Sequence, residues 1–277
     1  MAFGGGWVGR RESGQPFCSP TLEQLEPRLL LSGVTLITHG HMSGTGGWVS
    51  GMAGAIADRI NGDSAEYTLV LTEDTNNEPN GFNLIAEDIT RTYDIVDSGE
   101  AIIKVDWSSM TAGLFDFGTS TTDVGYYVAD WLAGSDFAEM PIHLIGHSRG
   151  ASVSTAIAER LAESGIWVDH VTTLDPHPIF DDSPIDMYGN IRFADNFWRT
   201  GFGDPGGEFV AGAHNQQLNE DILDGWWEDL GYSGGHDDVH LWYHGTIDND
   251  GDIWDLEERV AVEDSGQWYD PADGMPG

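Results

Sequence analysis

Residues 142–151 read Ile-His-Leu-Ile-Gly-His-Ser-Arg-Gly-Ala, and this stretch decides the fold. An apolar run leads into Gly146, Ser148 and Gly150, and a helix-like run over residues 151–163 follows. The order predicts a strand, a sharp turn and a helix, with a serine at the turn. Glycines on both sides of the serine permit a strained turn and a close approach of strand and helix. The pattern Gly-x-Ser-x-Gly in this context predicts a nucleophile elbow, where helix-start amides can also bind an anion.

Strands and helices alternate on both sides of this stretch. Apolar, β-branched runs predict buried strands at 34–38, 67–71, 101–105 and 168–174, and periodic apolar residues predict helices at 48–61, 121–133 and about 239–247. This alternation favours the α/β class, with a mostly parallel sheet covered by helices on both faces. Active sites of such sheets lie at the carboxyl ends of the strands, where His39-Gly40, Asp106, Ser148 and Asp175 fall.

The 277 residues suffice for one large catalytic domain, which we expect over 34–250. Residues 178–235 lack a clean period and are rich in aromatic residues, so they are predicted to be an insertion, either a lid or acyl pocket or a plain hydrophobic cover. Residues 251–277 are expected to form an acidic tail, and residues 1–33 a leader outside the fold.

The leader ends in Leu-Glu-Pro-Arg-Leu-Leu-Leu-Ser-Gly at residues 25–33. This run resembles the LEPR-XLL segment found near the N-terminus of some bacterial exported or surface proteins. The resemblance implies export to the periplasm, the cell surface or the medium. The alternative is a short amphipathic segment that packs on the domain.

The net charge of −36, with Lys104 as the single lysine, argues against nucleic acid or anionic membranes as partners. Such a surface fits either a saline habitat or a need for solubility. No apolar run reaches the about 18 residues of a membrane span, so stable membrane insertion is not expected. The single cysteine, Cys18, excludes an internal disulfide.

A serine hydroxyl needs a base to accept its proton, and the base needs a third group to orient it. Asp175 follows an apolar strand that Pro176 ends, so we expect it to be the orienting acid; the alternative is a cap of the following turn. The candidate bases are His170, His177, His214, His236, His240 and His244. His236 follows two glycines and is predicted to lie in a loop within reach of Ser148.

His240 and His244 stand one helical turn apart and are interpreted as surface or packing residues. A metal pair is disfavoured because no His-Glu-x-x-His pattern is present, and no metal is predicted in the site.

Five blocks in order resemble the pancreatic-lipase-type α/β-hydrolases. They are Thr38-His39-Gly40-His41 with Trp48, Val105-Asp106-Trp107-Ser108, the elbow with Arg149 where leucine is usual, Thr173-Leu174-Asp175-Pro176, and His236 followed by Trp242-Tyr243 and Thr246-Ile247. The resemblance implies the α/β-hydrolase fold, with Ser148 as nucleophile, Asp175 as acid and His236 as base. The backbone amides of His41 and Arg149 would form the oxyanion hole. The family's lid disulfides and C-terminal β-sandwich have no counterpart, so its form of interfacial activation is not expected.

The predicted function is hydrolysis of a small-molecule or lipid carboxylic ester through an acyl-enzyme. The alternatives are an amidase or acyltransferase with the same triad, and a catalytically silent surface-binding module. No cofactor is required for this chemistry. Structural calcium is an open alternative at Asp248-Asn249-Asp250-Gly251-Asp252, or at Asp181, Asp182 and Asp186, where the family can bind it; these residues otherwise form solvated acidic loops. The sequence makes no prediction about oligomeric state.

Overall fold

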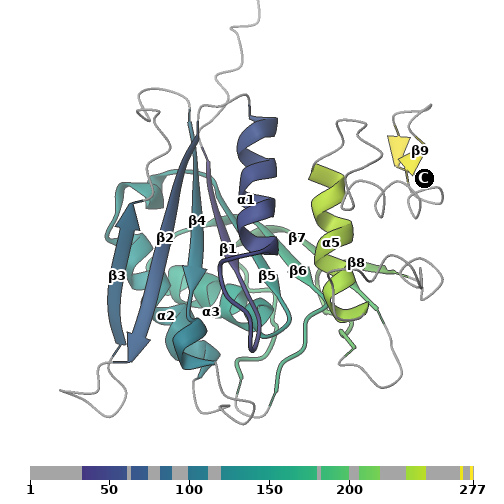
Figure 1. Ribbon diagram of the computed structural model, residues 1–277. Helices are drawn as coiled ribbons and strands as arrows, with labels where there is room; N and C mark the ends of the chain where they lie inside the picture. Colours follow the sequence, from purple (N-terminus) through teal and green to yellow (C-terminus); the bar gives the residue numbers. More distant parts are fainter. Residues whose placement is uncertain are drawn as a thin grey trace, which may run out of the picture.

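Strands from across the chain form one sheet in the order β3-β2-β4-β1-β5-β6-β7-β8 (Figure 1). The computed structural model describes residues 33–60, 64–73, 82–88, 99–111, 120–179, 182–199, 206–218, 235–247, 269–270 and 275–276. The strands are β1 (Val34–Thr38), β2 (Ser64–Glu73), β3 (Phe82–Asp88), β4 (Glu100–Asp106), β5 (Ile142–His147), β6 (Val168–Leu174), β7 (Ile191–Trp198) and β8 (His214–Gln217). Only β3 runs antiparallel to its neighbour within this sheet.

Helices cover both faces of the sheet. They are α1 (Trp48–Arg59), α2 (Thr121–Ala133), α3 (Arg149–Glu163) and α5 (Gly235–Ile247), and short 3-10 turns occur at Ser108–Met110 and Asp136–Glu139. Tyr269–Asp270 (β9) and Met275–Pro276 (β10) form a separate small antiparallel pair. No helix in the described part of the chain is long and apolar enough to cross a membrane.

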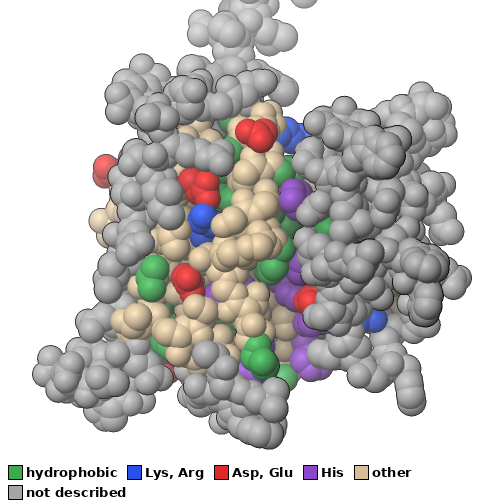
Figure 2. All heavy atoms as spheres, in the orientation of Figure 1, with side chains coloured by type: hydrophobic (Ala, Val, Ile, Leu, Met, Phe, Trp, Pro, Cys, Tyr) green, Lys and Arg blue, Asp and Glu red, His purple; other side chains and the backbone are tan. Residues whose placement is uncertain are grey.

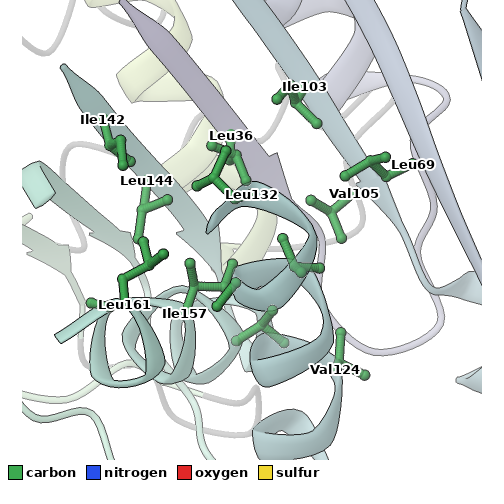
Figure 3. Close-up of a cluster of buried hydrophobic side chains, with 14 of the residues drawn as sticks. Leu36, Leu69, Ile103, Val105, Val124, Leu132, Ile142, Leu144, Ile157 and Leu161 are labelled. Atoms are coloured by element: carbon green, nitrogen blue, oxygen red, sulfur yellow. The ribbon is translucent and has the colours of Figure 1, made fainter. Parts of the chain in front are cut away.

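The first core lies between the sheet and α2 with α3. Strand residues such as Leu36, Ile103 and Leu144 point toward helix residues such as Leu132 and Ile157 (Figure 3). All five side chains are at most 1% exposed. Successive side chains of a strand point to opposite faces of the sheet, so the same strands also contribute side chains to a second core on the other face.

The second core lies under α1 and α5. Ile37, Ile102 and Ile145 pack there with Met52 of α1 and Val239 of α5. A sheet buried on both faces has near-continuous apolar strands, which explains why the sequence identified its central strands. The predicted α/β class is therefore confirmed.

Two features differ from the sequence predictions. The stretch 178–235, predicted to be an insertion, contains β7 and β8, which extend the sheet. The inward face of β7 carries Asn196, fully buried, whose side chain binds Thr173, Glu208 and Asn215. This buried polar residue interrupts the apolar pattern of β7, so the sequence pattern did not predict a strand there. His236, predicted to lie in a loop, lies instead in the first turn of α5.

Candidate active site

Ser148 lies between the end of β5 and the start of α3. Its backbone φ of 56° and ψ of −126° fall outside the regions that L-residues favour. The turn is held because its amide donates to the carbonyl of Leu174 at 2.9 Å and its carbonyl accepts from Ala151 at 3.1 Å. A conformation of this kind costs on the order of 1–3 kcal/mol and persists only where surrounding contacts impose it.

Two glycines make this turn possible through close backbone approaches. A carbon added at Gly150 would lie 2.5 Å from the carbonyl oxygen of Thr38, so α3 can meet β1 only without a side chain there. A carbon added at Gly40 would lie 2.7 Å from Cβ and 3.1 Å from Oγ of Ser148. The loop that follows β1 therefore runs directly beside the serine hydroxyl.

The mostly parallel sheet, helices on both faces and a serine at a strained strand-to-helix turn define the α/β-hydrolase fold.

Asp175 is paired with His236. The Nδ1 atom of His236 lies 2.6 Å from Oδ2 of Asp175, and the carboxylate has no exposed surface. Its Oδ1 accepts from the backbone amides of Arg199 and Gly207, both at 2.9 Å. Because a carboxylate oxygen accepts in this contact, Nδ1 of His236 is the donor, and in the neutral ring the lone pair is then on Nε2. This is the tautomer that a serine-activating base requires.

Backbone contacts bring this pair to the elbow. The Nε2–H group of His147, directly before Ser148, donates to the carbonyl of His236 at 2.8 Å. The amide of His177 donates to the carbonyl of Ser148 at 3.4 Å. Asp175 follows Leu174, the residue whose carbonyl accepts from Ser148. Three segments far apart in sequence thus meet around Ser148, Asp175 and His236.

The loop that carries His41 is fastened to the end of β4. The backbone amide of Trp107 donates to Nε2 of His39 at 3.2 Å, and the Trp107 indole donates to the carbonyl of His39 at 3.0 Å. The two rings stack with centroids 5.4 Å apart. His39 is fully buried, so it fixes the loop backbone instead of facing a substrate. His41 lies in the turn that follows.

Arg149 is the first residue of α3, where helical amides have no partner within the helix. Its side chain turns away into the core and forms a two-pronged pair with Asp182, with N–O distances of 2.8 and 2.6 Å. Both side chains are 2% exposed, and the guanidinium lies 5.3 Å from the Trp107 ring centroid. Arg149 thereby links the elbow to the loop around Asp182.

Several of these roles carry no sequence signal. Arg199 and Gly207 contribute backbone amides, which no residue type marks in the sequence. Position 207 nevertheless requires a glycine, because an added carbon would lie 2.3 Å from Oδ1 of Asp175. Asp182 stood out in the sequence only as a calcium candidate. Because both of its oxygens accept from Arg149, calcium at that carboxylate would have to compete with the ion pair. Asp181 and residues 248–252, the other calcium candidates besides Asp186, lie outside the described residues.

No protein-family model matches the sequence, and no curated protein shows significant similarity to it. Among solved structures, a protein of Lactobacillus plantarum WCFS1 described as a candidate cell-surface hydrolase is similar, with a TM-score of 0.47, 9% identity, and coverage of 85% of this chain and 97% of that one. RedJ, a thioesterase from the prodiginine biosynthetic pathway in Streptomyces coelicolor, is similar with a TM-score of 0.28 and 17% identity over 57% of this chain. The match covers 44% of the RedJ chain in that structure. A second RedJ structure is similar with a TM-score of 0.29 and 15% identity, and the match covers 50% of its chain. The strand order and the elbow define the fold independently of these similarities.

Proposed function

We propose that the protein is a serine hydrolase of carboxylic esters. The observation that carries the proposal is the 2.6 Å contact between Nδ1 of His236 and Oδ2 of Asp175 beside the strained turn at Ser148. In this mechanism, Ser148 Oγ attacks the ester carbonyl carbon while Nε2 of His236 accepts the hydroxyl proton. The same imidazole then donates that proton to the departing alkoxide, and water releases the acyl group by the reverse sequence.

The oxyanion of the tetrahedral intermediate would bind the backbone amides of His41 and Arg149. The position of Arg149 at the start of α3 and the closeness of Gly40 to Ser148 Oγ support this assignment. A donor of this kind typically contributes about 3–4 kcal/mol in the transition state. The buried Arg149–Asp182 pair would keep the amide of Arg149 in place.

An apolar acyl group fits the side chains near the site. Met42, next to His41, is 57% exposed, and Phe209, two residues beyond Gly207, is 64% exposed. Both residues follow directly in the chain from segments that contact Ser148 or Asp175, and we propose that their side chains contact an apolar acyl group. We therefore expect esters of medium or long acyl chains to be better substrates than acetate esters.

The decisive experiment is turnover of p-nitrophenyl esters of increasing chain length by the wild type and Ser148→Ala. Loss of the nucleophile should lower kcat by about 10⁴-fold or more. The matched control is Ser152→Ala, a buried serine one turn further along α3, which should keep wild-type turnover. Wild-type protein that turns over no ester in the panel would exclude the proposal and favour a silent binding module.

The same assay separates an acyltransferase from a hydrolase. With a competing alcohol present, an acyltransferase forms the new ester at the expense of the free acid, whereas a hydrolase releases mainly the acid. An anilide substrate in the panel tests the amidase alternative.

We also propose that the protein is exported, on the basis of residues 25–33, which lie outside the described residues. Expression of the full chain and of residues 34–277, each followed by cell fractionation, tests this. Both forms remaining in the cytoplasm would contradict it.

A further inference from the structure

Three potential metal ligands gather next to the candidate active site. His147 ends β5 directly before Ser148, and Asp237 and His240 stand on α5 directly after His236. One ligand atom from each of the three lies within 4.8 Å of the other two. Histidine side chains gather beside α1 on the face of the molecule shown in Figure 2. From the sequence, a metal pair of His240 with His244 was disfavoured. In the structure, His240 lies instead with His147 of β5 and Asp237 of α5.

The three side chains differ in exposure in a way that suits a metal site. His147 is 3% and His240 2% exposed, whereas the Asp237 side chain is 35% exposed. Asp237 and His240 stand at positions i and i+3 of the helix, and Oδ1 of Asp237 lies 3.9 Å from Nε2 of His240. The two imidazoles are therefore enclosed, whereas the carboxylate is partly exposed.

The surrounding contacts fix the imidazole rings. The hydrogen bond from His147 Nε2–H to the carbonyl of His236 leaves the lone pair of this ring on Nδ1. Metal-binding histidines commonly donate their second nitrogen to a backbone carbonyl in this way. Trp48 stacks on His240 with ring centroids 4.4 Å apart and meets the His147 ring edge-on at 5.7 Å.

We propose that His147, Asp237 and His240 bind a zinc ion. Two imidazole nitrogens and one carboxylate oxygen are a ligand set typical of Zn²⁺, whereas Ca²⁺ and Mg²⁺ prefer oxygen ligands throughout. Water would complete the four-coordinate shell. The ion would join the end of β5 to the first turn of α5, and so fix the residues that precede Ser148 and follow His236. This proposal does not depend on the proposed esterase function.

The test is calorimetric titration of the metal-free full chain with ZnCl2 at about 0.15 M NaCl, where diffuse attraction by the acidic surface is screened. The wild type should bind one equivalent and gain thermal stability as zinc is added. Asp237→Ala should bind at least about 10-fold more weakly and gain correspondingly less stability, since even second-shell losses cost 10–100-fold. CaCl2 should produce neither effect.

Two further variants serve as controls. His214→Gln removes a 70% exposed imidazole elsewhere and should bind zinc as the wild type does. Ser148→Ala should also retain zinc binding, which separates this proposal from the esterase proposal. If Asp237→Ala does not fold without zinc, His240→Gln takes its place. Wild-type protein that binds no stoichiometric zinc, or a folded ligand variant that binds it as tightly as the wild type, would overturn the proposal.

Discussion

The Asp175 carboxylate combines burial with three donors. It has no exposed surface and accepts from two backbone amides as well as from His236. Burying a charge is costly unless hydrogen bonds replace its hydration, so the two amides at Oδ1 offset the desolvation. Oδ2 faces the His236 imidazole, and Nε of Arg199 lies 3.9 Å from the same oxygen. The backbone amides of Arg199 and Gly207 therefore help to fix the carboxylate that orients His236.

Arg149 and Asp182 are also buried charges, and each replaces its lost hydration by contact with the other. Removal of one partner leaves an uncompensated charge in the core, so Asp182→Ala should lower the free energy of unfolding by about 3–5 kcal/mol. Urea denaturation at neutral pH measures this change. The proposed esterase activity of the remaining folded protein should also fall, because the side chain that holds the Arg149 amide loses its partner.

A matched control lies on the surface. Asp130 also holds an arginine, Arg160, through two N–O contacts of 2.8 and 3.2 Å, but the Asp130 side chain is 57% exposed. Asp130→Ala should leave the urea midpoint almost unchanged, since solvent screens this pair. Equal losses in Asp130→Ala and Asp182→Ala would show that burial does not distinguish the two pairs.

His143, partly buried on β5, should make folding pH-dependent. Its ring stacks on His170 with centroids 4.2 Å apart, and its Nε2 lies 2.9 Å from Oγ1 of Thr172. Burial and the neighbouring His170 lower its pKa to about 3, against about 6.5 in an unfolded chain. Between these values the unfolded state binds more protons than the folded state, so stability falls as the pH falls.

His143→Gln should therefore lose less stability than the wild type between about pH 7 and pH 5, by up to about 2 kcal/mol. Urea denaturation at both pH values gives the comparison. His214→Gln, which removes an exposed imidazole, should keep the wild-type pH dependence. An unchanged pH dependence in His143→Gln would contradict the assignment.

At the scale of elements, α2 and α3 touch through a glycine. A carbon added at Gly125 of α2 would lie 2.5 Å from Cβ of Ala156 and 2.9 Å from the carbonyl oxygen of Val153. The two helices can approach this closely only because position 125 has no side chain. This contact packs α3, and with it the elbow, against the rest of the molecule.

Gly125→Ala should destabilise the protein by about 1–3 kcal/mol because the helices must separate. Gly54→Ala is the matched control in α1, where no atom lies within 4 Å of the added carbon. That change should stabilise the protein by about 0.5–1 kcal/mol, since glycine is the poorer helix former. Thermal unfolding of both variants checks the opposite signs, and a shift in the same direction would contradict the packing argument.

At the scale of the whole molecule, the net charge of −36 opposes the compact state through self-repulsion. Added salt screens this repulsion, with a Debye length that falls from about 30 Å at 0.01 M to about 8 Å at 0.15 M. The urea midpoint at neutral pH should therefore rise as NaCl is raised over this range. Choline chloride at equal ionic strength should raise it equally, and a midpoint insensitive to both salts would contradict the prediction.

The sequence by itself determined the central strands β1, β5 and β6, the helix α3 and the turn at Ser148. These features depend on neighbours in the chain: apolar runs, helical spacing, and glycines that permit a strained turn. Sequence reasoning also selected Asp175, because a strand that ends in Asp-Pro delivers a carboxylate to the active edge of the sheet.

Sequence reasoning selected His236 from six histidines, and the structure shows its contact with Asp175. Only the tertiary structure decided that His236 lies on a helix, that Arg149 turns inward to Asp182, and that β7 and β8 extend the sheet. Each of these depends on segments that are far apart in the chain and meet through strand register and loop path. Asn196 in β7 is polar by its own chemistry and is buried only because Thr173, Glu208 and Asn215 satisfy it. A local sequence pattern does not predict such contacts. The partner that makes burial of each polar residue favourable lies far away in the sequence.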